Sequence, residues 1–114
     1  MKFLVMMTDI EGEWDRLSAS EQDRVIAAHA EIEKELRAQG KFVSSSRLRP
    51  SVEAKTVRLR ADGTTVVTDG PFTETKEALG GYYLIECPSM DEALRWARRL
   101  RFIVGANEVR PIWQ

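Results

Sequence analysis

Two helix-start signals constrain the fold of this chain more than any other feature. Ser18 stands three residues before Glu21, and Ser89 stands three residues before Glu92. Each pair has the pattern of a capping box, in which the two side chains bond free backbone N–H groups at the start of a helix. Apolar residues then recur at helical spacing, with Val25, Ile26, His29, Ile32 and Leu36 in the first stretch and Ala93, Trp96, Ala97 and Leu100 in the second. The sequence therefore predicts two amphipathic helices, one ending near Gln39 and the other near Arg101.

Strand-like runs occupy most of the chain outside these helices. They are Lys2–Thr8, Lys41–Leu48, Ala54–Arg60, Thr64–Thr68, Tyr82–Cys87 and Glu108–Trp113. The turn Ala61-Asp62-Gly63 joins the third run to the fourth, which predicts a hairpin. The complete order is β-α-β-β-β-β-α-β, and without the hairpin it is the βαβ-βαβ pattern of a ferredoxin-like sheet. A chain of 114 residues is long enough for one core, so we expect a single α+β domain over residues 1–114.

The first strand is apolar on both of its faces. Phe3, Val5 and Met7 alternate with Leu4 and Met6, so both faces of the sheet need a cover. Two helices cover one face of such a sheet. A second subunit on the other face is the simplest cover, and the sequence therefore predicts a homodimer.

Composition argues against several classes of function. The net charge is −1 and the pI is near 5.9, without the basic excess of a domain that binds nucleic acid directly. The basic run Arg95, Arg98, Arg99 and Arg101 fits the solvated C-terminal end of a helix. One histidine and the lone Cys87 do not make a metal site, and no nucleotide fingerprint is present, so we expect neither metal nor cofactor. The opening apolar run is too short to span a membrane, which favours a cytoplasmic protein.

A rigid loop follows the predicted hairpin. It runs from Asp69 to Glu77 as DGPFTETKE and is closed by Gly80-Gly81. Pro71 fixes its own φ angle and restricts Gly70, and Phe72 is expected to tuck beneath the loop. Two interpretations remain open: a well-built structural turn, or a loop that presents Asp69, Glu74 or Lys76 to a cleft.

The stretch DGPFTETKEALGGYYLIE resembles the signature of the DGPF branch of the YCII-related family. The likeness extends over almost the whole chain, from Lys2–Thr8 to the closing Glu108-Val109-Arg110-Pro111. It implies a dimeric α+β barrel with a pocket between helix and sheet, in which a histidine of the first helix faces an aspartate. His29, eleven residues before Gly40, matches that histidine, and Asp69 is the best match for the aspartate. Many DGPF proteins resemble one another in having an aromatic residue at this position, whereas this chain has the histidine.

An Asp–His pair suits general acid–base catalysis, because the carboxylate fixes the imidazole tautomer and stabilises the imidazolium. The resemblance implies a small-molecule enzyme of lyase, isomerase or dehalogenation type, with His29 and Asp69 as its catalytic pair. We expect an anionic or cyclic organic substrate that contacts Ser45, Arg47, Phe72 and Tyr82. Four arginines, Arg47, Arg49, Arg58 and Arg110, are also available for a phosphohistidine, which the family has been suggested to carry.

Two alternatives to catalysis stay open at this point. His29 lies on an apolar helix face, so it is also consistent with a core histidine whose nitrogens are satisfied by neighbours. DGPF proteins are often encoded beside sigma factors of the extracytoplasmic-function type. The resemblance therefore also implies a possible regulatory or binding module that contacts a sigma factor in transcription initiation.

Overall fold

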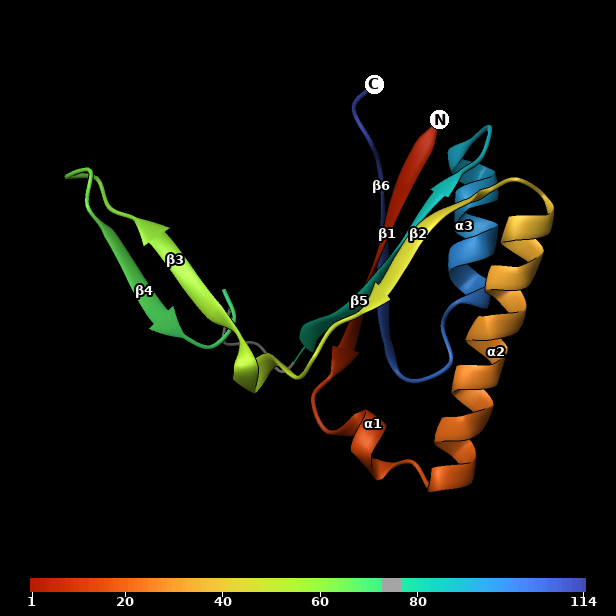
Figure 1. Ribbon diagram of the computed structural model, residues 1–114, viewed down its shortest axis with the longest axis horizontal. Coiled ribbons are helices and arrows are strands. Elements are labelled where there is room, and N and C mark those ends of the chain that lie inside the picture. The colour runs from red at the N-terminus through yellow and green to blue at the C-terminus, as the bar shows by residue number, and fades with distance from the viewer. Residues whose placement is uncertain (73–76) are drawn as a thin grey trace.

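The computed structural model describes residues 1–72 and 77–114 and has the predicted α+β class (Figure 1). The strands and the two long helices follow the predicted order, and two short elements, α1 and η1, were not predicted. The elements are β1 (Lys2–Ile10), α1 (Glu13–Arg16), α2 (Ala19–Ala38), β2 (Phe42–Arg47), the 3₁₀ turn η1 (Ser51–Glu53), β3 (Lys55–Leu59), β4 (Thr65–Asp69), β5 (Glu77–Glu86), α3 (Met90–Arg99) and β6 (Gly105–Pro111). Strands β2-β5-β1-β6 form an antiparallel sheet in that order, and β3 and β4 form a separate hairpin. The loop candidates Glu74 and Lys76 lie outside the described residues.

The two long helices, α2 and α3, begin directly after Ser18 and Ser89, as the sequence predicted. The Ser18 hydroxyl accepts the Glu21 backbone N–H at 3.2 Å, and the Glu21 carboxylate accepts the Ser18 backbone N–H at 3.1 Å, which completes the capping box of α2. In α3, Ser89 accepts the backbone N–H of Glu92. The Glu92 carboxylate instead pairs with Lys41 at 2.9 Å, so the second box is half formed. This pair also ties α3 to the start of β2.

The core lies between the two long helices and one face of the sheet. Phe3, Val5 and Ile85 of the sheet pack with Leu36 of α2 and Leu100, which caps α3, and each of these side chains is almost inaccessible to solvent. Figure 1 shows α2 and α3 together on this side of the sheet. The alternation predicted for the first strand is therefore confirmed on its core-facing side.

The opposite sheet face is open. Leu4 pairs directly with Leu84, and Met6 with Tyr82, so these four side chains share that face and are half-buried by their neighbours in the sheet. No helix among the described elements lies over them (Figure 1). No helix in the described part of the chain is long and apolar enough to cross a membrane.

The β3–β4 hairpin projects away from the sheet, on the side opposite the long helices (Figure 1). Its root is fixed by two hydrogen bonds of 2.8 Å, from the Gly70 N–H to the Ala54 carbonyl and from the Thr56 hydroxyl to the Gly70 carbonyl. The prediction that Phe72 tucks beneath its loop is wrong, because its side chain is 72% exposed. Phe72 follows the hairpin, which projects away from the core. The centre of its ring lies 5.3 Å from the guanidinium carbon of Arg58, and the ring does not pack on an apolar surface of the core.

The contact between β2 and β5 requires a glycine, which makes a stability test possible. A Cβ atom at position 81 would lie 2.8 Å from the backbone oxygen of Ser46, closer than carbon and oxygen pack. We expect Gly81→Ala to lower the free energy of unfolding by about 1–3 kcal/mol, because the added methyl overpacks two paired backbones. Ala106→Ser, an exposed change in the edge strand β6, is the control. Identical thermal melts for the two variants would contradict the close approach of β2 and β5.

Candidate functional site

A cavity of about 870 Å³ opens between α2, the end of β1, the β2–β5 edge and the segment that follows α3. Its volume falls in the range of small-molecule binding pockets. Its principal side chains come from four elements and from the segment that follows α3, and they are Asp9, Trp14, His29, Tyr83, Arg101 and Phe102. Aromatic, cationic and acidic groups therefore meet around one space.

His29 is held in this cavity by two aromatic residues. Its Nδ1 shares a hydrogen bond of 2.9 Å with the Tyr83 hydroxyl, and its ring meets Phe102 edge-on at a centroid distance of 4.8 Å. Within the described residues, Nε2 makes no hydrogen bond. A core histidine of the fully satisfied kind would have partners for both ring nitrogens. The arrangement instead leaves one nitrogen available to a ligand.

The surroundings of His29 favour the neutral imidazole. Burial lowers its pKa below the usual 6.5, and the nearby positive charge of Arg101 lowers it further, while the Asp9 carboxylate acts in the opposite direction. Burial, with the charge of Glu33, raises the pKa of Tyr83 to about 12. At neutral pH the site therefore holds an uncharged imidazole hydrogen-bonded to an uncharged phenol.

The Asp9 carboxylate is held at the end of β1 by Arg101. The Nη2 group of Arg101 donates to Asp9, and Nη1 donates to the Thr8 carbonyl at 2.9 Å and to Asn107 Oδ1 at 2.9 Å. The same side chain also bonds the carbonyls of Ala106 and Ile103. Arg101 was assigned to a solvated helix end by the sequence, but it is a half-buried clamp that joins β1, β6 and the preceding loop.

Gly80 leaves the space that Asp9 occupies. A Cβ atom at this position would lie 2.5 Å from Oδ2 of Asp9. Any other residue at position 80 would push the carboxylate away or shift β5. The glycine pair that closes the DGPF stretch therefore has two separate roles: Gly80 accommodates Asp9, and Gly81 accommodates the backbone of β2.

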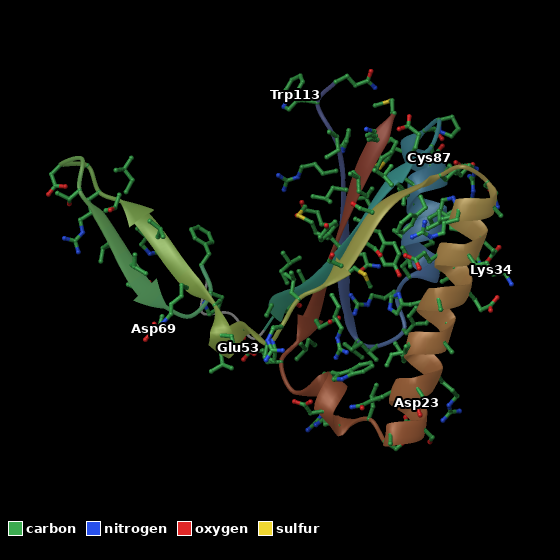
Figure 2. The ribbon with its side chains drawn as sticks, in the orientation of Figure 1. Asp23, Lys34, Glu53, Asp69, Cys87 and Trp113 are labelled. Atoms are coloured by element: carbon green, nitrogen blue, oxygen red, sulfur yellow. The ribbon has the colours of Figure 1, made fainter. Side chains whose placement is uncertain are left out.

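The predicted pairing of His29 with Asp69 is not what the structure shows. Asp69 ends β4 on the projecting hairpin, away from α2, and its exposed carboxylate pairs with Lys55 (Figure 2). We expected Asp69 to face the first predicted helix, α2, but Asp69 lies on the hairpin, which projects away from that helix. The carboxylate that acts on His29 is Asp9, which directly follows the predicted first strand. That position, at the strand end nearest the start of α2, was the available signal.

The other predicted contacts divide between the cavity and the arm. Ser45, Arg47 and Tyr82 line the cavity. Ser45 donates to Glu33 at 3.3 Å, and the Arg47 guanidinium lies 4.6 Å from the centre of the Trp14 ring. Phe72 lies on the exposed loop at the root of the hairpin and is not among the lining residues.

Tyr83, the neighbour of the predicted contact Tyr82, is the tyrosine that bonds His29, and it was not among the predicted site residues. The registers explain this choice. Tyr83 pairs with Val5 on the core face, whereas Tyr82 pairs with Met6 on the open face.

Of the arginines considered for a phosphohistidine, Arg47 and Arg49 line the cavity. Arg58 donates to the Phe72 carbonyl, and Arg110 pairs with Glu108. In residues 1–72 and 77–114, no three acidic, histidine or cysteine side chains gather as a metal site would require.

The single histidine gives a direct test of which aspartate acts on it. Asp9→Asn should lower the pKa of His29, because it removes the one negative charge that raises this pKa and leaves the Arg101 charge in place. Asp69→Asn is the matched control and should leave the titration unchanged. An NMR titration of the imidazole protons measures both. A shift in the Asp69 variant with none in the Asp9 variant would restore the pairing expected from the sequence.

Comparisons with known proteins identify the family to which this chain belongs. An uncharacterized protein of Rhizobium meliloti (strain 1021) is 40% identical over 115 aligned positions, which cover 98% of this chain and 92% of that protein. The solved structure of 5-chloro-2-hydroxyhydroquinone dehydrochlorinase (TftG) from Burkholderia phenoliruptrix AC1100, in complex with 2,5-dihydroxybenzoquinone, is similar with a TM-score of 0.54. That likeness covers 100% of this chain and 94% of TftG at 19% identity, and it shows a shared fold. The YCII-related domain matches residues 1–114, and the chain belongs to the YCII-related family.

Proposed function

We propose that this protein is an enzyme that moves a proton on a small cyclic organic substrate, with His29 as the general base and acid. The observation that carries the proposal is a half-buried imidazole in a ligand-sized cavity, with Nδ1 bonded to Tyr83 and Nε2 unbonded within the described residues. Burial also lowers the pKa of this imidazole, which favours its neutral form. A base works best when its pKa lies close to the working pH and its free nitrogen is held in place. In His29 the hydrogen bond to Tyr83 holds the ring in place, and burial lowers its pKa, so that the imidazole is neutral at pH 7.

Tyr83 sets the direction of the transfer. Its high pKa keeps the phenol uncharged, and in the tautomer that we propose the phenol oxygen accepts the Nδ1–H of His29. The lone pair of the imidazole then resides on Nε2, which takes the proton from the substrate. The resulting imidazolium is stabilised by the nearby Asp9 carboxylate. A positioned acid–base group of this kind typically contributes about 10²–10⁴-fold to the rate.

The cavity walls suit a planar ring with an electron-rich or anionic substituent. Trp14 and Phe102 supply aromatic surface, and Arg47 supplies a positive charge. TftG, which shares the fold, is named for the removal of hydrogen chloride from a chlorinated hydroxyhydroquinone. Such a reaction needs a base for the proton and a path for the chloride. We therefore propose hydroxylated or halogenated ring compounds as the substrate class, with lyase, isomerase or dehalogenation chemistry.

The binding-module alternative requires no such site. A protein that only contacts a sigma factor does not need a half-buried histidine with a lowered pKa in a cavity. The arrangement of His29, Tyr83 and Asp9 therefore favours the enzyme.

Replacement of His29 tests the proposed chemistry. Chloride release from 5-chloro-2-hydroxyhydroquinone, and turnover of related ring compounds, should fall about 10²–10⁴-fold in His29→Gln. Asp69→Asn should turn over at the wild-type rate. Binding is tested separately by titrating 2,5-dihydroxybenzoquinone while the imidazole NMR signals are recorded. Unchanged turnover in His29→Gln, or imidazole signals that no ring compound moves, would contradict the proposal.

The pH dependence has a defined sign. His29 acts as a base only when it is neutral, so kcat/KM should fall as the pH drops through its pKa, which burial places below 6.5. Activity should therefore be fully present at pH 7 and lost on the acid side. A profile that rises as the pH falls from 7 to 5 would assign the essential group to an acid instead.

We also propose a homodimer that covers the open sheet face. Leu4, Met6 and Leu84 form the apolar centre of that face, and both long helices lie on the other side. Light scattering after size exclusion should give about twice the chain mass of 13.0 kDa at micromolar concentration. A mass equal to one chain would leave the face uncovered and overturn this part of the proposal.

A further inference from the structure

We propose that the β3–β4 hairpin is an arm that grips the second copy of the chain in the homodimer. This inference rests on the homodimer proposed above and goes beyond it, because it assigns the hairpin a contact that the sheet face does not make. Three observations support it: the exposed face of the hairpin, the direction in which it projects, and its place beside the cavity.

One face of the hairpin is apolar and exposed. Val57 and Val67 stand opposite each other in the ladder, and Leu59 follows on the same face. Their exposures are 66%, 61% and 75%, respectively. The other face behaves differently, since Thr56 is buried and Arg58 lies against Phe72. A two-stranded hairpin is at best marginally stable in water without a surface to pack on, so this face needs a cover.

The hairpin projects to the side of the molecule that is already open. Figure 1 shows α2 and α3 on one side of the sheet and the hairpin on the other. The molecule is accordingly broad and flat, with extents of 49 × 41 × 18 Å. A body seated on the sheet face centred on Leu4 and Met6 therefore approaches the hairpin as well. One partner can cover both surfaces.

A second copy fits this double requirement better than an unrelated protein. In a two-fold dimer each subunit presents the same patch, so each supplies one sheet face and one arm to the other. The exposed face also has no net charge to attract an acidic or basic partner, because its charged pair, Lys55 and Asp69, is mutually neutralised. The arms would then hold the two sheet faces together from opposite sides.

The arm also connects the interface to the candidate site. The cavity lining includes Ser51 and Val52 at the root of the hairpin and Tyr82 of the open sheet face. Val52 is 83% exposed. A partner gripped by the arm lies beside this rim, so we expect ring-compound binding to weaken when the dimer dissociates.

The side chains chosen for substitution are exposed, so we expect the variants to fold like the wild type. Val57→Lys with Leu59→Lys places two charges on the arm, and Val104→Lys is the matched control, since Val104 is 67% exposed in the segment after α3. In the full-length protein, sedimentation equilibrium should show a dimer dissociation constant at least about tenfold weaker for the arm variant. The control should stay within about twofold of wild type. Circular dichroism checks that each variant is folded.

A photo-crosslinking amino acid at Leu59 gives an independent readout. Dimers assembled from equal amounts of ¹⁴N- and ¹⁵N-labelled chains should yield crosslinked peptide pairs that contain one label of each kind, as contacts between subunits require. Wild-type dimerisation with an unchanged dissociation constant in the arm variant, or crosslinks within one subunit alone, would overturn the arm. A wild-type monomer would overturn the homodimer as well, so the two failures are distinguishable.

Discussion

The hydrogen bonds of Arg101 support the part of the molecule on which the candidate site depends. This one side chain bonds backbone carbonyls at the end of β1, at the start of β6 and in the loop between α3 and β6, and it also pairs with Asp9. Each of these hydrogen bonds satisfies a backbone carbonyl, so a single guanidinium stabilises three segments at once. It also neutralises the Asp9 carboxylate. Without that charge, Asp9 would act on His29 unopposed and favour the imidazolium.

The alternation of β1 and the geometry of its neighbour β5 together explain how Asp9 reaches this position. The ladder between β1 and β5 is irregular between Met7 and Thr8, next to the point where Gly80 faces Asp9. An irregular ladder re-aims the side chains beyond it. Here the extra residue is Gly80, so the re-aimed strand is β5, and β1 pairs regularly with β6 through the same stretch. Asp9 therefore continues the core-facing alternation of Phe3 and Val5 and lies at the cavity. The chemistry of the site therefore depends on backbone spacing as much as on its charged residues.

The parts of the fold that could be predicted from the sequence are those set by local signals. Ser18 and Ser89 begin helices because a serine side chain satisfies the backbone of the residues that immediately follow. The hairpin was predicted from its turn for the same reason. The direction in which that hairpin leaves the body is not local. It decides that Phe72 is exposed and that Asp69 lies far from His29, and it depends on packing between distant segments.

The candidate site shows the same division. His29, Ser45, Arg47 and Tyr82 were predicted as site residues and line the cavity, although their functional roles stay predictions. Tyr83 required the register of β5 against β1, since two adjacent tyrosines face opposite sides of a strand. Arg101 was hidden in a run of arginines whose other members lie on the exposed side of α3. One half-buried member of a charged run is recognised only when the neighbouring strands are in place.

The central claim is that His29 is a neutral base with its lone pair on Nε2, and the tautomer of this single imidazole tests it most directly. Long-range ¹H–¹⁵N correlation spectra at neutral pH distinguish a protonated nitrogen from an unprotonated one. The account predicts that Nδ1 carries the proton, which it donates to Tyr83, and that Nε2 is unprotonated. Tyr83→Phe should then mix the two tautomers. A proton found on Nε2, or an imidazolium at pH 7, would contradict the account.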